Sequence, residues 1–270
     1  MVFLCWARPS PEQQKSCINK SGTFNYDTKY KGATAKPVSC IKEDKELSKD
    51  GYLVNHARVL VGSGLQTYEK GKAALQNWRH FGLNWAFVDP KTPIQNGVKF
   101  CVCVKEFLPW VMMPLQVVYV KESKSAKTKK AVASFGFGSG TLQGHLLAGE
   151  ERFSIELDEN DQVWYEILSF SKPAHFLSFI GYPYVYLRQK YFAHQSANAV
   201  LNHWRSQNFL AGGGHVHKKF HQSSYTECCS LGVQFQLNNL NASAKQLSYF
   251  YRAFYPAYRD PPHDKEIKNL

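Results

Sequence analysis

The sequence predicts an α+β domain in which a curled antiparallel sheet grips a long C-terminal helix. Three observations predict this helix-grip fold: an amphipathic helix after the first strand, a series of strand-like segments behind it, and a long final helical segment. A sheet in this order can curl around a helix and leave a cavity between the two. The fold class is therefore α+β, with helix and sheet as partners in one core.

The first strand and the first helix of this domain follow each other directly. Residues 52–61 alternate between apolar and polar types, which is typical of a strand with one buried face. Ser63 followed by Gln66 is a capping-box signature, and Gly82 supplies a C-terminal stop. We therefore expect a helix over residues 64–81.

The pattern then changes to a period of two, which predicts six further strands. They are expected at residues 84–88, 98–106, 112–121, 131–142, 150–157 and 162–170. The Asp-Glu-Asn-Asp segment at 158–161 is a hairpin turn between the last two. Residues 184–204 contain no glycine or proline and carry apolar residues at helical spacing, so they form the long C-terminal helix.

The 270-residue chain divides into three parts by composition. Residues 1–50 are polar and rich in lysine, and we interpret them as an extended N-terminal arm that wraps around the domain. Residues 51–206 are the helix-grip domain. Residues 207–270 open with three glycines and show no stable period, which predicts an atypical, disordered C-terminal tail that folding does not need.

Composition limits the partners without naming one. Lys and Arg total 33 against 21 Asp and Glu, a net charge of +12 that attracts phosphates, anionic lipid or nucleic acid. No nucleic-acid recognition motif accompanies the charge, so we expect no specific nucleic acid, while an anionic membrane surface stays open as a partner. The sequence has seven unevenly spread cysteines, no signal-like start and no 20-residue apolar stretch, so the protein is not expected to be secreted. The oligomeric state stays unknown.

Two short motifs have structural interpretations. The run Gly136-x-Gly138-x-Gly140 is followed by another strand and not by the helix that a dinucleotide site needs, so these glycines are expected to shape the sheet. Cys101-x-Cys103 lacks a second pair of ligands at zinc spacing. We therefore expect no metal site and no cofactor.

Charged residues on apolar faces are the more informative signal. Glu151 shares strand parity with Phe153, and Glu166 shares it with Trp164, so both carboxylates are expected to point where apolar side chains point. Arg188 on the final helix is expected to face the sheet. There it either pairs with Glu166 or Glu151 as a structural ion pair or receives an anionic group of a ligand. The candidate ligand-binding residues are Arg188, Glu166, Glu151, His145, Trp164, Gln195 and Tyr191.

Several longer segments resemble a known family. They include Asn55-His-Ala-Arg-Val-Leu-Val-Gly-Ser-Gly64, Phe135-Gly-Phe-Gly-Ser-Gly-Thr-Leu-Gln-Gly-His145 and Trp164-Tyr-Glu-Ile-Leu-Ser-Phe-Ser-Lys-Pro173. These segments are similar to the plant branch of uncharacterised protein family 0548, and the resemblance covers roughly residues 1–204. It implies a domain like those of the START and Bet v 1 helix-grip superfamily. From plant relatives it also implies an association with the chloroplast outer envelope and a cation channel there.

Three functions compete at this point. The first is non-catalytic binding of a hydrophobic or amphipathic small molecule or lipid between the sheet and the final helix. The second is a chloroplast outer-envelope cation channel or membrane-associated protein, which the resemblance implies. The third is a cyclase-like or hydrolytic enzyme that uses His145 and Glu151, for which the sequence shows no nucleophile constellation. The binding function is preferred, with no catalytic residue assigned, and the location is cytosolic or, by resemblance alone, the chloroplast outer envelope.

Overall fold

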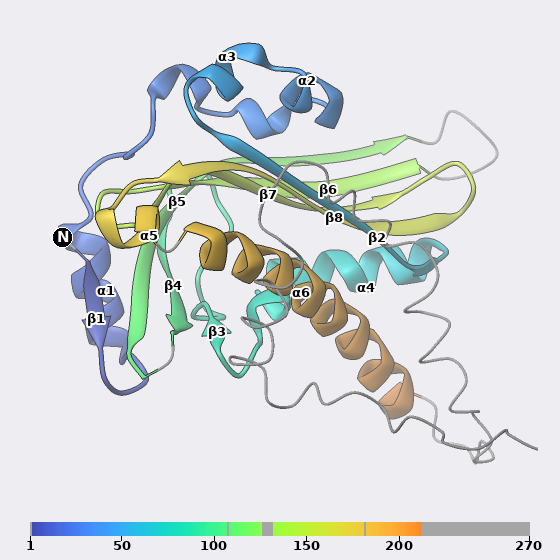
Figure 1. Ribbon diagram of the computed structural model, residues 1–270. Helices are drawn as coiled ribbons and strands as arrows, with labels where there is room; N and C mark the ends of the chain where they lie inside the picture. The colour runs from blue at the N-terminus through green and yellow to red at the C-terminus, as the bar shows by residue number, and fades with distance from the viewer. Residues whose placement is uncertain (1, 107, 126–131, 181, 212–270) are drawn as a thin grey trace, which may run out of the picture. The chain divides into compact units, whose positions relative to one another are not determined.

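The computed structural model describes residues 2–106, 108–125, 132–180 and 182–211, within a compact unit of Met1–Gly213 (Figure 1). The last helix, α6 (Tyr182–Ala211), continues past the predicted domain boundary at residue 206. A disordered tail was predicted for residues 207–270, but residues 207–211 belong to this helix. Its remainder, from residue 212 on, lies outside the described residues.

One antiparallel sheet forms the centre of the described chain, with the order β2-β8-β7-β6-β5-β4-β3 and with β1 beside β5. Its strands are β1 (Phe3–Cys5), β2 (Leu53–Ser63), β3 (Ala86–Phe87), β4 (Lys99–Lys105), β5 (Trp110–Ser125), β6 (Val132–Thr141), β7 (Leu147–Leu157) and β8 (Gln162–Pro173). The sheet curls around the long helix α6 (Figure 1). The predicted α+β fold class, a curled antiparallel sheet with a C-terminal helix, is confirmed.

The concave face of the sheet holds the main hydrophobic core. Helix α4 (Leu65–Gln76), the short 3-10 helix η3 (Arg79–Phe81) and α6 cover this face (Figure 1). The core contains the inward-facing strand residues Phe137, Phe153 and Ile167 together with Leu75 of α4 and Val200 of α6. Each of these side chains is buried, so the helices and the sheet share one core.

Helix α4 is shorter than the helix that the sequence predicted over residues 64–81. Its N-cap is Gly64, without a side-chain cap bond, and the helix ends at Gln76 where 64–81 was expected. Trp78 causes the early end, because it adopts a left-handed φ of 55°. In this conformation its indole Nε1 donates to the Thr92 carbonyl at 2.8 Å while the ring packs 4.7 Å from that of Phe100. Tertiary packing of one tryptophan therefore outweighs helix propensity.

The N-terminal segment covers the convex face, and it is not the extended arm that the sequence predicted. It contains the helices α1 (Pro11–Lys20), η1 (Thr28–Tyr30), η2 (Ala33–Ala35), α2 (Val38–Lys42) and α3 (Lys45–Lys49). Tyr30, Ile41 and Leu47 pack against Leu168 and Phe170 of β8 in a second core. The lysine-rich composition hid these short helices because each buries only one or two residues.

Two charged residues of β7 hold this segment on the sheet. The buried Glu150 carboxylate accepts hydrogen bonds from the Gly32 and Thr34 backbone N–H groups at 2.7 and 3.0 Å and from the Tyr26 hydroxyl at 3.0 Å. The Thr34 hydroxyl donates to it as well. Arg152 donates to the Thr34 and Lys36 carbonyls at 2.7 and 3.1 Å. Buried charges are stable only when paired in this way.

The glycines of β6 allow two tyrosines to lie against the strand. A side chain at Gly138 would collide with the ring of Tyr119, and one at Gly140 would come within 2.5 Å of the Tyr26 hydroxyl. The register of β6 with β7 stays regular through this region. The glycines therefore shape the structure by permitting close approach.

The connection from the sheet to α6 contains one further short helix, α5 (Phe176–Ile180). Ser178 in this helix accepts from the His175 N–H at 3.1 Å and donates to the Leu146 carbonyl at 2.6 Å. These bonds fasten α5 to the turn between β6 and β7, at the end of the sheet where α6 begins.

Candidate functional site

A row of polar side chains crosses the concave face of the sheet. The strand register places Asn55 of β2 opposite Ser169 of β8, Ser169 opposite Glu151 of β7, and Glu151 opposite Ser139 of β6. All four share strand parity with residues of the main core, so they face α6 and not the N-terminal segment. We refer to Asn55, Ser169, Glu151 and Ser139 as the polar row.

Three members of the polar row have no polar partner. Within the described residues, no hydrogen bond or ion pair reaches the Ser139 hydroxyl, the Ser169 hydroxyl or the Glu151 carboxyl. Both serines are buried and Glu151 is half-buried. In the described part of the chain, the buried side-chain atoms without a hydrogen bond are Tyr68 Oη, both His80 ring nitrogens and Arg152 Nε, and none of these belongs to the polar row. The unbonded polar atoms of the row are therefore not fully enclosed, and another molecule can supply their partners.

Glu151 also has an unusual acidity. The surrounding protein desolvates its carboxyl and raises the pKa from 4.5 to about 8. The same carboxyl lies near enough to Tyr165 for its charge to add to the burial that raises the pKa of that phenol. At neutral pH Glu151 is therefore a protonated acid that can donate a hydrogen bond.

An apolar row lies next to the polar row on the same face. It consists of Ala57, Ile167, Phe153 and Phe137, which are paired across β2, β8, β7 and β6 in the same way. Phe192 of α6 packs against Phe153 with 6.2 Å between ring centroids and against Phe81 at 4.8 Å. The concave face thus changes from polar to aromatic within two residues along each strand.

Helix α6 is fastened to the sheet on both sides of these rows. Gln189 accepts from the Asn55 amide at 3.0 Å and donates to the Ser171 hydroxyl at 3.2 Å. On the other side, Arg188 Nε donates to Glu106 at 3.2 Å and its guanidinium donates to the Lys105 carbonyl at 3.0 Å. Asn55 is therefore the one member of the polar row that α6 already satisfies.

The predicted pairing of Arg188 with Glu166 or Glu151 is wrong. Its carboxylate partner is Glu106, just after β4, and its guanidinium lies 3.7 Å from the centre of the Trp85 ring. The Tyr191 ring lies beside the same tryptophan, with 5.5 Å between centroids. Arg188 turns toward the β4 edge and not toward the middle of the sheet, because the helix crosses the concave face from one edge to the other.

Glu166 and Trp164 lie on the convex face, so the prediction that they face a cavity with Arg188 is also wrong. Glu166 forms ion pairs with Arg152 and with His56, the latter at 3.2 Å. These partners lower its pKa against the opposing effect of burial. Trp164 donates from Nε1 to Asp158 at 2.9 Å. Their parity with Leu168 and Phe170 was predicted correctly, but that apolar face is the one beneath the N-terminal segment.

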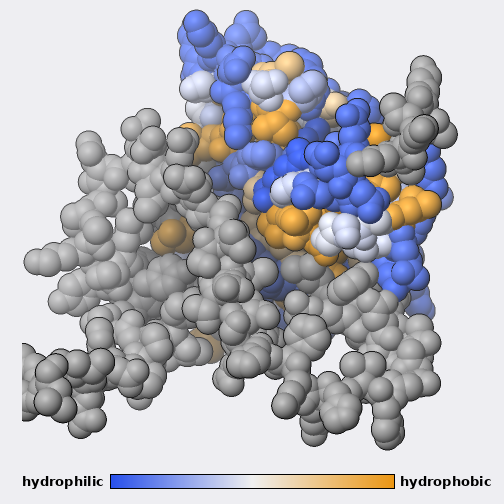
Figure 2. Space-filling model, turned by 90° about the vertical axis from the view of Figure 1, so that its right-hand side faces the viewer, coloured by the Kyte–Doolittle hydropathy of each residue, from blue (hydrophilic) through white to orange (hydrophobic). Residues whose placement is uncertain are grey.

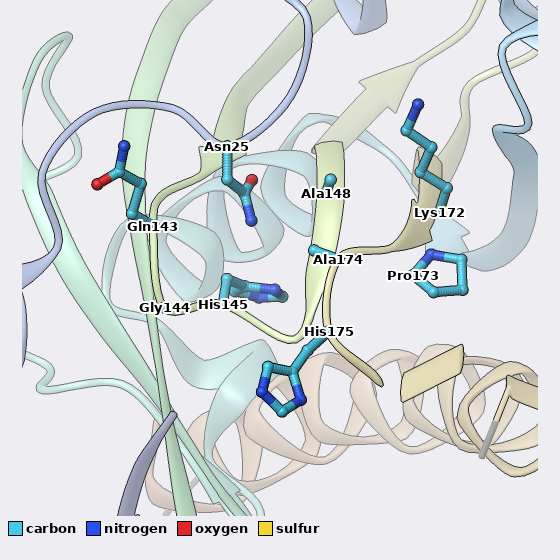
Figure 3. A pocket seen from close by; sticks show the side chains of 9 residues that line it. All are labelled: Asn25, Gln143, Gly144, His145, Ala148, Lys172, Pro173, Ala174 and His175. Atoms are coloured by element: carbon cyan, nitrogen blue, oxygen red, sulfur yellow. The ribbon is translucent and has the colours of Figure 1, made fainter. Parts of the chain in front are cut away.

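His145 lines a separate hollow of about 310 Å³ at the end of the sheet (Figure 3). Its Nδ1 accepts from the Leu147 N–H at 2.9 Å, and burial lowers its pKa to about 4, so the ring is neutral. Asn25 in the same hollow donates to the Leu147 carbonyl at 3.0 Å, and Lys172, which extends away from His145 in Figure 3, donates to the Asp50 carbonyl at 2.9 Å. These groups stabilise the turn, and they do not join Glu151 in one site.

The seven predicted residues therefore do not converge. Glu151 is on the concave face, Arg188 and Tyr191 are near Trp85, and Gln195 is half-buried on α6. Ser139 and Ser169 were not among the residues that the sequence predicted for the site. Each is a small polar residue at a position whose parity matches core phenylalanine or tyrosine, and this interruption of an apolar alternation was the available signal.

Cys17, Cys101 and Cys103 form a cluster of buried thiols. Cys101 Sγ lies 4.0 Å from Cys17 Sγ and 3.9 Å from Cys103 Sγ, and all three thiols are buried between α1 and β4. Hydrogen bonding between the thiols, with burial, raises the pKa of Cys101, so its thiol stays protonated. Among the described residues, no group of three or more His, Cys, Asp or Glu side chains is arranged to hold a metal ion.

On the face shown in Figure 2, hydrophobic areas are separated from one another by hydrophilic residues. Within the described part of the chain, no helix combines the length and the apolar character needed to cross a membrane.

The protein is an α+β domain in which a curled antiparallel sheet packs against one long C-terminal helix. A family model described as "Domain of unknown function (DUF1990)" matches residues 32–199, and the chain belongs to this family. An Arabidopsis thaliana relative, UPF0548 protein At2g17695, is 70% identical over 203 residues, which are 75% of this chain and 98% of the relative. The predicted membership of family 0548 is confirmed.

More distant relatives carry the same family name. A Dictyostelium discoideum UPF0548 protein is 30% identical over 211 residues, covering 74% of this chain and 94% of the relative. A Deinococcus radiodurans UPF0548 protein is 31% identical over 156 residues, covering 53% of this chain and 74% of the relative.

Solved structures show only weak similarity. Hypothetical protein jhp0584 from Helicobacter pylori aligns with a TM-score of 0.36 and 15% identity, covering 62% of this chain and 93% of that one. Ara h 8.0201 aligns with a TM-score of 0.35 and 9% identity, covering 56% of this chain and 99% of that one.

Proposed function

We propose that the concave face of the sheet binds an amphipathic small molecule. Its polar end lies at the polar row, and its apolar part lies along the apolar row beside Phe192. The observation that carries this proposal is the set of three adjacent polar groups without partners, Ser139, Glu151 and Ser169. A ligand that supplies hydrogen bonds to these groups gains about 0.5–1.5 kcal/mol for each bond.

The change from polar to aromatic side chains favours an amphipathic ligand over a fully apolar one. Phe153 and Phe137 lie directly beside the hydrogen-bonding groups, where they are buried in the aromatic core together with Phe192. Binding sites for small molecules commonly combine an apolar lining with a few placed polar groups. A hydrocarbon alone would leave the polar row unsatisfied.

The other functions considered for the sequence stay predictions. They are a cation channel or membrane-associated protein of the chloroplast outer envelope and a cyclase-like or hydrolytic enzyme. The cytosolic or envelope location and the anionic membrane partner also stay predictions. No contact among the described residues favours any of them over ligand binding.

Binding is tested with a neutral fluorescent probe and a nitroxide-labelled dodecyl amphiphile. We expect N-phenyl-1-naphthylamine to bind one per chain and to be displaced by dodecyl amphiphiles. The nitroxide should broaden the amide signals of Phe153 and Ile167 more strongly than those of Tyr30 and Leu47 in the convex core. Absence of displacement, or broadening confined to the convex residues, would contradict the proposal.

A further inference from the structure

The polar row also indicates which kind of polar group it accepts. Resting on the proposed function, we infer that the ligand ends in a neutral oxygen group, an alcohol or a carbonyl, that accepts a hydrogen bond from Glu151 and also bonds the hydroxyl of Ser139 or Ser169. This inference names the ligand class, which the proposed function leaves open.

The geometry of the row suits one small oxygen group. Adjacent strands lie about 4.8 Å apart, so Ser139 and Ser169 flank Glu151 at one strand spacing on each side. An oxygen held near the Glu151 carboxyl is therefore within reach of a flanking hydroxyl. A serine hydroxyl can both donate and accept, which matches an alcohol in both directions.

An anionic end group would find no cation in the row. The arginine next in sequence, Arg152, points to the convex face, where it binds the Thr34 carbonyl and Glu166. On α6, Arg188 is already held by Glu106 and the Lys105 carbonyl. A carboxylate or phosphate would therefore be desolvated without a counter-charge, which is strongly unfavourable.

A cationic end group would meet a single acid that keeps its proton at neutral pH. Burial holds the pKa of Glu151 at about 8, so an ammonium group would have to expel that proton before an ion pair could form. The two flanking serines give no additional charge. A neutral oxygen group requires no change in protonation.

The test compares three ligands with the same twelve-carbon chain: 1-dodecanol, dodecylamine and dodecanoate. Each displaces bound N-phenyl-1-naphthylamine from the full chain at pH 7. We expect 1-dodecanol to act at the lowest concentration and dodecanoate to need at least tenfold more. Equal potency of the three, or a stronger effect of the amine or the acid, would overturn the inference while binding itself stands. If none of the three displaces the probe, the proposed function fails instead.

Variants of Glu151 test whether the preference for 1-dodecanol depends on this carboxyl. Glu151→Leu should weaken 1-dodecanol about tenfold relative to the probe, whose own affinity for the variant is measured in parallel, because the variant keeps the volume and loses the hydrogen bonds. Glu151→Gln keeps a donor and an acceptor and should stay within about threefold of the natural protein. Glu159→Gln, in the exposed β7–β8 turn, is the matched control and should have no effect. Unchanged 1-dodecanol affinity in Glu151→Leu would contradict the inference.

Discussion

Glu150 and Glu151 are neighbours in the sequence with opposite environments. Glu150 is 2% exposed on the convex face, where it accepts four hydrogen bonds from the N-terminal segment. Glu151 lies on the concave face, where no described group bonds its carboxyl. Because successive strand residues alternate between faces, one peptide bond separates a carboxylate that stabilises the fold from one that is open to a ligand.

The two faces of the sheet differ in how their polar side chains are bonded. Charges that hold the convex face together are paired: Glu150 with the N-terminal segment, and Glu166 with Arg152 and His56. On the concave face, Gln189 and Arg188 of α6 bond the polar groups closest to the edges, Asn55 and Glu106, and the groups in the middle are left without partners among the described residues. The number of hydrogen-bond and ion-pair partners therefore distinguishes the carboxylates that stabilise the fold from the proposed ligand-binding carboxyl better than burial does.

The largest expected effect comes from removing the convex carboxylate. Glu150→Ala leaves the Gly32 and Thr34 N–H groups and two hydroxyls without their acceptor, and we expect a loss of about 3 kcal/mol or more in the free energy of unfolding. Urea denaturation at pH 7 measures it. Glu156→Ala is the control, since its side chain is 43% exposed and its pair with Arg58 is worth about 1 kcal/mol or less. Equal losses in the two variants would show that the convex network contributes little.

Part of this comparison was accessible from the sequence. Alternation correctly placed Glu151 on the core face with Phe153, and it correctly grouped Glu166 with Leu168 and Phe170. The error was to assume a single apolar face. The short helices of residues 11–49 create a second core on the convex side, and their one or two buried residues each leave no clear periodicity in the sequence.

The partner of Arg188 could not be predicted for a different reason. It depends on the direction in which α6 crosses the sheet, and this is set by packing against η3, α4 and the strand edges. The importance of Ser139 and Ser169 similarly depends on strand register, which the pattern of a single strand does not determine.

The second effect is the contribution of Glu151 to the pH dependence of stability. Burial raises the pKa of Glu151 to about 8 in the folded protein, against about 4.3 in the unfolded chain. Below a pH of about 4.3 the side chain is protonated in both states and does not lower the free energy of unfolding. Between a pH of about 4.3 and about 8 the free energy of unfolding falls as pH rises, because only the unfolded chain has lost the proton. Glu151→Gln removes this loss. At pH 9 the variant should be more stable than the natural protein by on the order of 2 kcal/mol, after allowance for partial screening by solvent.

Thermal unfolding at pH 5, 7 and 9 measures this difference. The gap between Glu151→Gln and the natural protein should widen with pH. A gap that is the same at all three values would show that Glu151 has an ordinary pKa and is well solvated.

A smaller effect is expected at the edge of the concave face. Arg188→Met removes a partly buried ion pair with Glu106 and the contact with Trp85, which together contribute about 1–2 kcal/mol. Affinity for 1-dodecanol should stay unchanged, because Arg188 does not belong to the polar row. Chemical denaturation and probe displacement test both parts, and a loss of affinity in a folded variant would return Arg188 to the binding site.

The smallest effect is expected within the polar row itself. Ser139→Ala removes a hydroxyl that has no described partner, so the free energy of unfolding should change by no more than about 0.5 kcal/mol. Ser178→Ala removes a hydroxyl bonded to the His175 N–H and the Leu146 carbonyl and should cost about 1–2 kcal/mol. A larger loss in Ser139→Ala than in Ser178→Ala would mean that Ser139 has a structural role.

The most direct test of ligand binding at the polar row is the carbon-13 chemical shift of the Glu151 side-chain carboxyl, followed against pH with and without 1-dodecanol. The assignment comes from comparison with Glu151→Gln. We predict a midpoint near 8 in the free protein, in line with the desolvated carboxyl, and a higher midpoint with 1-dodecanol, because the ligand accepts a hydrogen bond from the protonated form. A midpoint near 4.5 that the alcohol does not move would contradict the account.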